Sequence, residues 1–338
     1  MSHIKVLGID LAKDVFQLHG TDAKGKKVLS KRLNRSKLME YMSNLSPCLV
    51  GIEACGSSHY WAREFREHGH TVKMMAPQFV KPYVKSNKND PRDAEGIAEA
   101  VTRPTMRFVP IKEIEQQDIL LLHRVRELAM KQRTAQGNQI RGLLAEYGVI
   151  IPKGISSFTR LPETLEEAGT KLTPVAKELF IQLYEQLKIY IQQVKDHEHK
   201  IEQHAARDPR CIAIQEIEGI GPITASALVA SISDPNVFKN GREVSAWLGL
   251  VPRQFSSGNK IILGGIGKRG DHYLKKLLIH GGRSVVKVCE KKTDRKSEWV
   301  KDKLHRGGFN KAAVAVANKN ARVVWALLAT GECYRKAA

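Results

Sequence analysis

Short apolar runs separated by turn residues fill the first hundred positions and predict a small sheet with helices. Three runs follow one another closely, with turn residues at 22–25 between the second and third, so they predict a β-meander. Later runs alternate with stretches of helical spacing. Strands are expected at residues 4–9, 15–19, 27–33, 49–52 and 71–75, and helices at residues 36–45 and 58–67.

The resulting order of elements is β-β-β-α-β-α-β. An antiparallel start followed by a parallel half is the order of ribonuclease-H-like domains. We therefore predict an α/β, ribonuclease-H-like (RuvC-like) domain over residues 1–110.

The middle of the chain has the spacing of two long helices. Residues 114–147 predict the first, ended by Gly148 and Pro152. Its apolar face is expected to carry Leu121, Leu122, Val125, Leu128 and Ala129.

A second helix is predicted to begin at Thr173, with Pro174 as its first helical residue. Its spacing alternates between three and four, which forms an a/d seam over three heptads and predicts an α-helical coiled-coil hairpin over residues 111–207. The seam could pack within one chain or join two subunits. Its residues are Phe180, Leu183, Leu187, Tyr190, Val194, His197, Ile201 and His204, and the two histidines are expected to be packed rather than to bind metal.

After Asp208 and Pro209, the pattern is one of helices separated by glycine turns. The main loops are expected at residues 241–258 and 264–270, and a final helix at about 311–328. We predict a mainly α-helical C-terminal domain over residues 208–338.

The charge pattern points to a polyanionic partner. The net charge is +20, and the last 88 residues hold 20 Lys and Arg against 6 Asp and Glu. A nucleic-acid backbone is the commonest partner of so local a surplus, although a generally basic surface would give the same count.

The cysteines and the hydropathy indicate a cytoplasmic protein. Five cysteines occur without a Cys-x-x-Cys pair, which favours a reducing compartment. No signal peptide is visible, and no apolar run reaches the roughly 18 residues of a membrane span.

Two carboxylates stand where strands of the predicted sheet end. Asp10 closes the first strand, and Glu53 closes the strand of residues 49–52. If these strands are parallel neighbours, both acids emerge at one sheet edge, where sites of open α/β sheets lie. An acid at this position can also simply cap a helix or face solvent.

Two more acids open a predicted helix. Asp90 is a good N-cap, Pro91 a good first residue, and Asp93 a favourable first-turn charge, so capping alone explains them. Their spacing also puts both acids on one helical face. Four converging carboxylates would repel one another without a cation, and Mg²⁺ is the natural occupant of such an oxygen-rich site.

The C-terminal third offers candidate phosphate contacts. Gly219 and Gly221 form a hairpin that opens a helix, where backbone N–H groups can hold a phosphate; a plain tight turn would have the same sequence. Ser256 and Ser257 lie in a loop that is ordinary by composition. Expected nucleic-acid contacts around this loop are Arg253, Lys268, Arg269, Lys275 and Lys276.

Taken together and in order, these motifs resemble the DEDD transposases of bacterial insertion sequences, the bridge-RNA-guided recombinases. The resemblance covers nearly the whole chain. Its landmarks are Gly8-Ile9-Asp10, Ile52-Glu53-Ala54, Asp90-x-x-Asp93-Ala94, Gly219-Ile220-Gly221, Gly249-Leu250-x-Pro252, Ser257-Gly258 and Lys268-x-Gly270.

The resemblance implies a resolvase-like domain with a metal tetrad at Asp10, Glu53, Asp90 and Asp93, and a transposase domain with a nucleophile at Ser257, next to Ser256. It implies Mg²⁺-dependent strand cleavage and rejoining through a covalent phosphoserine. Donor and target DNA, a non-coding bridge RNA, and a homo-oligomer (dimer or tetramer) are the implied partners. Cys55 departs from the pattern, because many relatives carry threonine or serine there.

Two other functions remain open from the residues alone. A resolvase-like nuclease would hydrolyse DNA junctions or hybrids with the tetrad and without a covalent step. A non-catalytic nucleic-acid scaffold would use the acids only to cap helices and close strands.

Overall fold

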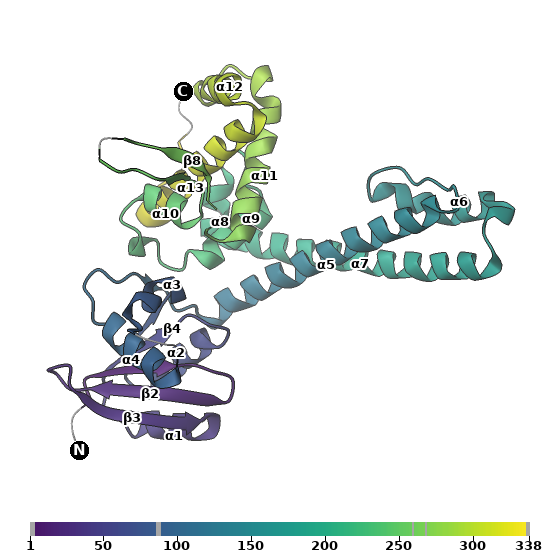
Figure 1. Cartoon of the computed structure of the whole chain (residues 1–338). Helices are drawn as coiled ribbons and strands as arrows, with labels where there is room; N and C mark the ends of the chain where they lie inside the picture. Colours follow the sequence, from purple (N-terminus) through teal and green to yellow (C-terminus); the bar gives the residue numbers. More distant parts are fainter. Residues whose placement is uncertain (1–3, 86–88, 259, 268, 336–338) are drawn as a thin grey trace. The chain divides into compact units, whose positions relative to one another are not determined.

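The computed structural model describes residues 4–85, 89–258, 260–267 and 269–335. The chain forms two compact units, Met1–Glu115 and Gln116–Ala338 (Figure 1). Among the described residues, no helix has the length and apolar character needed to span a membrane.

A six-stranded sheet in the order β3-β2-β1-β4-β5-β6 organises the first unit. β1, β2 and β3 are antiparallel, β4 and β5 continue parallel to β1, and β6 closes the edge antiparallel to β5. This is the antiparallel start and parallel half that the sequence predicts. The strands are β1 (Val6–Asp10), β2 (Val15–Thr21), β3 (Lys27–Asn34), β4 (Leu49–Glu53), β5 (Thr71–Met75) and β6 (Phe108–Val109).

Apolar side chains of the sheet pack with the first helices in one core. Phe16, Trp61 and Phe65 are fully buried there and form adjacent aromatic contacts. The helices of this unit are α1 (Arg35–Ser43), α2 (Ser58–Glu67), α3 (Pro77–Val80), the 3₁₀ turn η1 (Lys81–Tyr83) and α4 (Asp90–Ala100).

Helix α4 lies directly on the sheet, against β1, β2 and β4. The approach is close because glycines stand beneath it. A side-chain carbon on Gly8 would overlap the backbone of Ala94 and Ala98, and one on Gly51 would lie 2.8 Å from Cβ of Val101. Only residues without a side chain allow this packing.

The second unit begins with a helical hairpin, in which α5 and α7 run side by side (Figure 1). Arg126 pairs with Glu198, and Gln136 donates to the carbonyl of Leu183, so the helices are antiparallel. Its elements are α5 (Ile114–Ala145), η2 (Ser156–Arg160), α6 (Leu161–Glu167), η3 (Gly169–Lys171) and α7 (Pro174–Arg207).

The predicted seam of α7 is its buried face. Thr173 caps the helix by accepting from the Ala176 N–H at 3.2 Å. Of the eight seam residues, Phe180, Leu187, Val194 and Ile201 are buried. Because several of them share a core with residues of α5 and α6, the seam packs within the chain.

The predicted apolar face of α5 is wrong for Leu121, Val125 and Leu128, whereas Ala129 is buried as predicted. Leu121 and Leu128 are 60% and 55% exposed, whereas His123 and Arg126 are buried. Polar side chains can face inward here because distant residues satisfy their hydrogen bonds, with Glu198 as the partner of Arg126.

The remainder of the second unit is mainly helical, as predicted. The two segments expected as loops contain helix and strand. Residues 241–258 hold α10 and β7, and residues 264–270 hold all of β8 except its first residue, Leu263. The final helix begins two residues earlier than expected. The elements are α8 (Pro209–Gln215), α9 (Pro222–Ser231), η4 (Pro235–Val237), α10 (Gly241–Trp247), β7 (Pro252–Gln254), β8 (Leu263–Ile266), α11 (His272–Val288), η5 (Cys289–Lys291), α12 (Arg295–Gly307) and α13 (Phe309–Thr330).

Candidate active site and nucleic-acid contacts

Asp10 and Glu53 end neighbouring parallel strands in matching positions. The register pairs Gly8 with Gly51 and Ile9 with Ile52, and the two acids follow next. Side chains alternate between the faces of a sheet, so Asp10 shares a face with Gly8, and Glu53 with Gly51. This is the face that α4 covers, and both acids are partly buried.

Helix α4, which packs on this face of the sheet, carries the other two acids in its first turn. At its C-terminal end, Val101 lies over Gly51 of β4. Ala94, near the helix start, lies over Gly8. The helix therefore passes over β1 and β4 at the level of the paired residues Gly8 and Gly51, and Asp90 and Asp93 stand in its first turn.

The cap of α4 differs from the prediction. Asn89, and not Asp90, is the N-cap, and its side-chain oxygen accepts from the Arg92 N–H at 3.1 Å. Asp90 is exposed and Asp93 partly buried. The cap requirement is thus met without either carboxylate.

In the described part of the chain, the oxygens of the four acids are not gathered into one cluster. Within the described ranges, one group of side chains has ligand atoms that all lie within 4.8 Å of one another, as a metal site would require. It consists of His204, Asp208 and Cys211 and includes no member of the tetrad. All four acids offer hard carboxylate oxygens, which are the ligands that a divalent cation such as Mg²⁺ prefers.

The His204, Asp208 and Cys211 cluster is explained by local structure. Asp208 caps α8, accepting from the Arg210 N–H at 2.9 Å, and pairs with the Arg210 guanidinium at 2.8 Å. Burial raises the pKa of the Cys211 thiol to about 12, so the thiol stays protonated. We assign this cluster to helix capping and core packing.

Ser257 lies in the β7–β8 hairpin, beyond the end of β7. It bridges to Lys260, whose N–H donates to the Ser257 carbonyl at 3.2 Å, and Gly258 takes a φ of +56°. The hydroxyl of Ser256 accepts from Gln254 at 2.9 Å, whereas the Ser257 hydroxyl has no hydrogen bond within the described part of the chain. Ser257 is exposed, so its oxygen is accessible to a substrate.

The ammonium group of Lys275 is turned into the protein and is not available at the surface. The side chain is buried, and its ammonium donates to the carbonyls of Gly267 at 3.0 Å and Arg269 at 2.7 Å. Burial lowers the pKa of Lys275. Its contacts hold the loop before α11 in place, which corrects the expectation of a direct phosphate contact. Lys268, predicted in the same loop, lies outside the described residues.

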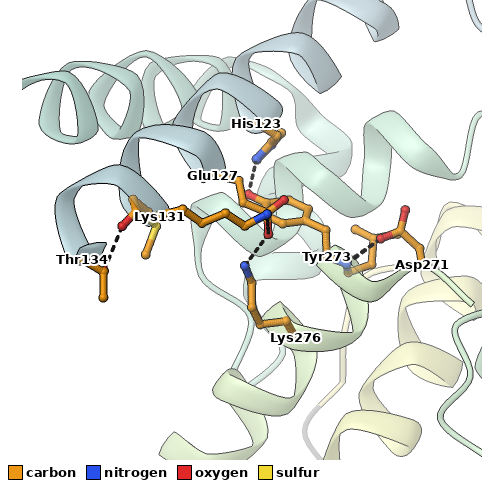
Figure 2. A network of polar contacts seen from close by, with 9 residues as sticks. His123, Glu127, Lys131, Thr134, Asp271, Tyr273 and Lys276 are labelled. Carbon is orange, nitrogen blue, oxygen red and sulfur yellow. Dashed lines mark hydrogen bonds and ion pairs between the residues drawn. The ribbon is translucent and has the colours of Figure 1, made fainter. Parts of the chain in front are cut away.

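The other predicted cations of this region are exposed. Arg253 and Arg269 are open to solvent. Lys276 is exposed as well, but it is paired with Glu127 at 2.7 Å (Figure 2). The positive charge of Lys276 is therefore partly balanced by the Glu127 carboxylate.

A polar network that the sequence did not indicate anchors the start of α11. His123 of α5 contacts the Tyr273 hydroxyl at 2.9 Å and the Ser226 hydroxyl at 3.2 Å, and Asp271 caps the helix at the Tyr273 N–H (Figure 2). Burial, helped by the nearby Arg126 charge, lowers the pKa of His123 to about 4. The imidazole is therefore neutral at pH 7.

The glycine hairpin at the start of α9 is packed into the helical body. Gly219 has a φ of +90°, and a side-chain carbon there would lie 2.8 Å from the carbonyl oxygen of Gly281. Glu218 is held by Lys292 at 2.6 Å, and its carbonyl accepts from Asn320 at 2.9 Å. Gly221, the N-cap of α9, is exposed beside a cavity of about 550 Å³. The turn is therefore fixed, and its outer residue faces open space.

Comparison with known proteins places these features in a family. Residues 211–298 match the family described as "Transposase IS116/IS110/IS902 family", and residues 7–149 match the DEDD transposase family of the IS110 type. A "Probable family 20 transposase" of Pseudomonas aeruginosa is 49% identical over 97% of this chain and 98% of its own.

Two further relatives are similar along their length. The "Transposase for insertion sequence element IS1111A" of Coxiella burnetii is 45% identical, over 99% of this chain and 92% of its own. The "Transposase for insertion sequence element IS1328" of Yersinia enterocolitica is 38% identical, over 99% of this chain and all of its own.

The α/β sheet with an acidic edge and the mostly helical, basic remainder are those of a DEDD transposase, a class of DNA-processing enzymes that typically use a divalent metal. The chain belongs to the IS116/IS110/IS902 family of insertion-sequence transposases.

Proposed function

We propose that this transposase cuts and rejoins DNA strands with a metal-binding tetrad and a serine nucleophile. The observation that carries the proposal is the matched placement of Asp10 and Glu53 at the ends of parallel neighbours, on the face that α4 covers. A second pair of acids, Asp90 and Asp93, opens that helix. Capping does not explain them, because Asn89 provides the cap.

The tetrad would hold Mg²⁺ through its carboxylate oxygens. When bound, Mg²⁺ would neutralise charge on the scissile phosphate and favour loss of the proton from the attacking hydroxyl. The chain's own contribution is to fix the four acids on two strand ends and one helix start. Gly8 and Gly51 serve this placement, since they let α4 reach the sheet.

Ser257 would be the nucleophile. Its Oγ forms a bond to phosphorus while the bond to one bridging oxygen breaks, and that oxygen leaves with the proton as a strand-end hydroxyl. Attack by a hydroxyl from another strand reverses the exchange, so the phosphodiester energy is conserved without ATP. Both serines are exposed, and the hydrogen bond that Ser256 accepts from Gln254 favours Ser257 as the nucleophile.

The partners would be donor and target DNA, with a non-coding bridge RNA selecting sequence by base pairing. The basic C-terminal region suits polyanions, and the exposed Arg253, Arg269 and Gly221 are its candidate contacts. We also propose that the protein forms a homo-oligomer for symmetric strand exchange. The α7 seam does not support oligomerisation, because the seam packs within the chain.

Covalent trapping tests the proposal. Wild-type protein with its RNA, a labelled DNA substrate and Mg²⁺ should give a protein–DNA adduct that survives denaturation. Ser257→Ala should abolish the adduct, and Ser256→Ala should retain it. Persistence of the adduct in Ser257→Ala would exclude this serine. If the wild-type protein cleaves DNA without forming an adduct, and Asp10→Asn abolishes that cleavage, the protein is a hydrolytic nuclease. If it binds DNA without cleaving it, the protein is a scaffold.

A further inference from the structure

A second cavity in the helical unit has no assigned role. It has a volume of about 930 Å³ and lies between α10, α12, α13 and the base of the β7–β8 hairpin. None of the nucleic-acid contacts predicted from the sequence lines it. We call it the α13 groove; the lining residues used below are Arg242, Trp299, Lys311, Lys319, Arg322 and Trp325.

The rim of the α13 groove is cationic. Arg242, Lys311, Lys319 and Arg322 are exposed, and no carboxylate lines the groove. In the described ranges, none of the four forms an ion pair, whereas other lysines of this unit, such as Lys276, do. Four uncompensated cations around one cavity favour an anionic occupant.

The floor of the groove is apolar and aromatic. Trp299 and Trp325 line it together with aliphatic side chains of α13. Trp325 donates its indole N–H to the Pro235 carbonyl at 3.0 Å, which fixes the ring. The Lys319 ammonium lies 4.5 Å from the centre of the Trp299 ring. An occupant must therefore offer both negative charge and flat, apolar surface.

The groove walls are rigid. Gly241 lets α10 approach α13, since a side-chain carbon there would lie 2.8 Å from the Arg322 carbonyl oxygen. Ser245 donates to the Asn318 carbonyl at 3.2 Å, and Asn318 donates to that of Leu250 at 3.1 Å. A preformed groove binds with less loss of entropy than one that must be ordered.

We propose that the α13 groove binds a segment of single-stranded nucleic acid, with phosphates on the cationic rim and bases against the indoles. Unpaired bases can stack on aromatic side chains, and this contact tolerates any sequence. A duplex presents phosphates and sugars outward with its bases paired inside, so it would leave the apolar floor uncovered. The inference rests on the proposed function only in that a strand-exchanging enzyme must handle unpaired strands.

Equilibrium binding by the full-length protein tests the groove without catalysis. Fluorescence anisotropy would be measured in EDTA, with a labelled oligothymidylate and an oligouridylate of about a dozen nucleotides, and with a duplex of equal length. The double variant Lys319→Glu, Arg322→Glu removes two rim charges. The matched control Lys195→Glu, Lys200→Glu reverses two exposed charges on α7.

The groove variant should lose about tenfold or more in affinity for single strands and distinctly less for the duplex, while the control changes each by about twofold. A preference between the DNA and RNA probes would identify which strand the groove takes. Equal losses in the groove and control variants, or equal losses for single strand and duplex, would overturn the proposal. If the reversal unfolds the protein, Lys319→Gln, Arg322→Gln gives the same comparison.

Tryptophan fluorescence supplies an independent readout. A base stacked in the groove should quench Trp299 or Trp325, so oligothymidylate should quench wild-type emission, and Trp299→Phe, Trp325→Phe should remove most of the quenching. Quenching unchanged in that variant would contradict base contact. Ser257→Ala should bind and quench like wild type, so failure of the serine chemistry and failure of the groove are separate outcomes.

Discussion

A side-chain carbon on Gly8 of β1 would overlap the backbone carbonyl oxygen of Ala94 of α4. The helix that carries Asp90 and Asp93 thus rests on the strand that ends at Asp10 with no side chain between them. This contact connects the packing of the sheet to the placement of the candidate site.

Gly8→Ala should therefore both destabilise the first unit and impair the site. Overpacking at a tight contact costs about 1–3 kcal/mol, and any relief must move α4, which carries Asp90 and Asp93, away from β1. Urea unfolding and Mg²⁺-dependent strand cleavage would be measured together. Gly56→Ala is the stability control, because a side-chain carbon there has open space; equal stability of the two variants would refute the packing argument.

Much of the first unit could be predicted from the sequence because apolar runs and turn residues are local signals. The strands that end at Asp10 and Glu53 have the parallel pairing the pattern implies. The cap of α4 was misassigned because Asn89 and Asp90 are both good caps, and sequence alone does not choose between neighbours.

The second unit was harder to predict because its decisive contacts join distant residues. His123 and Tyr273 are 150 positions apart, so no local pattern shows that a histidine belongs on the buried face of α5. Nothing in the sequence distinguishes Lys275 from a surface lysine. Its burial is evident only from the structure, where its ammonium group donates to the carbonyls of Gly267 and Arg269. The α13 groove likewise draws its lining from several elements.

Lys275→Met should loosen the loop before α11. Two carbonyls lose their donor, and unsatisfied polar groups cost about 1–3 kcal/mol each when buried. We expect a lower free energy of unfolding and faster trypsin cleavage after Arg269. Lys276→Met should change stability by less than about 1 kcal/mol, because its ion pair is largely exposed. If Lys276→Met proved the more damaging, the assignment of Lys275 as a positioning residue would fail.

His123 should make stability fall in mild acid. Its pKa is about 4 in the folded chain and 6.5 for a free histidine, so the unfolded state binds the proton more readily. The stabilisation is present above about pH 6.5 and is lost as pH falls toward 4, with a size of a few kcal/mol at most. Urea unfolding at pH 7 and pH 5 would measure it.

His123→Gln should flatten that pH dependence, whereas replacement of the exposed His199 by Gln should leave it unchanged. An unchanged slope in His123→Gln would show that other groups govern acid sensitivity.

Cation binding is the most direct test of a metal site shared by the four acids. Mg²⁺ at a hundredfold excess over its Kd should stabilise the wild-type protein by about 2.7 kcal/mol, seen as a higher Tm than in EDTA. Asp10→Asn and Asp93→Asn should abolish the gain, because each removes a carboxylate ligand of the cation. Glu95→Gln, an exposed neutralisation on the same helix, should keep the full gain. A Mg²⁺ response that survives in Asp10→Asn and Asp93→Asn would contradict a shared cation at this edge of the sheet.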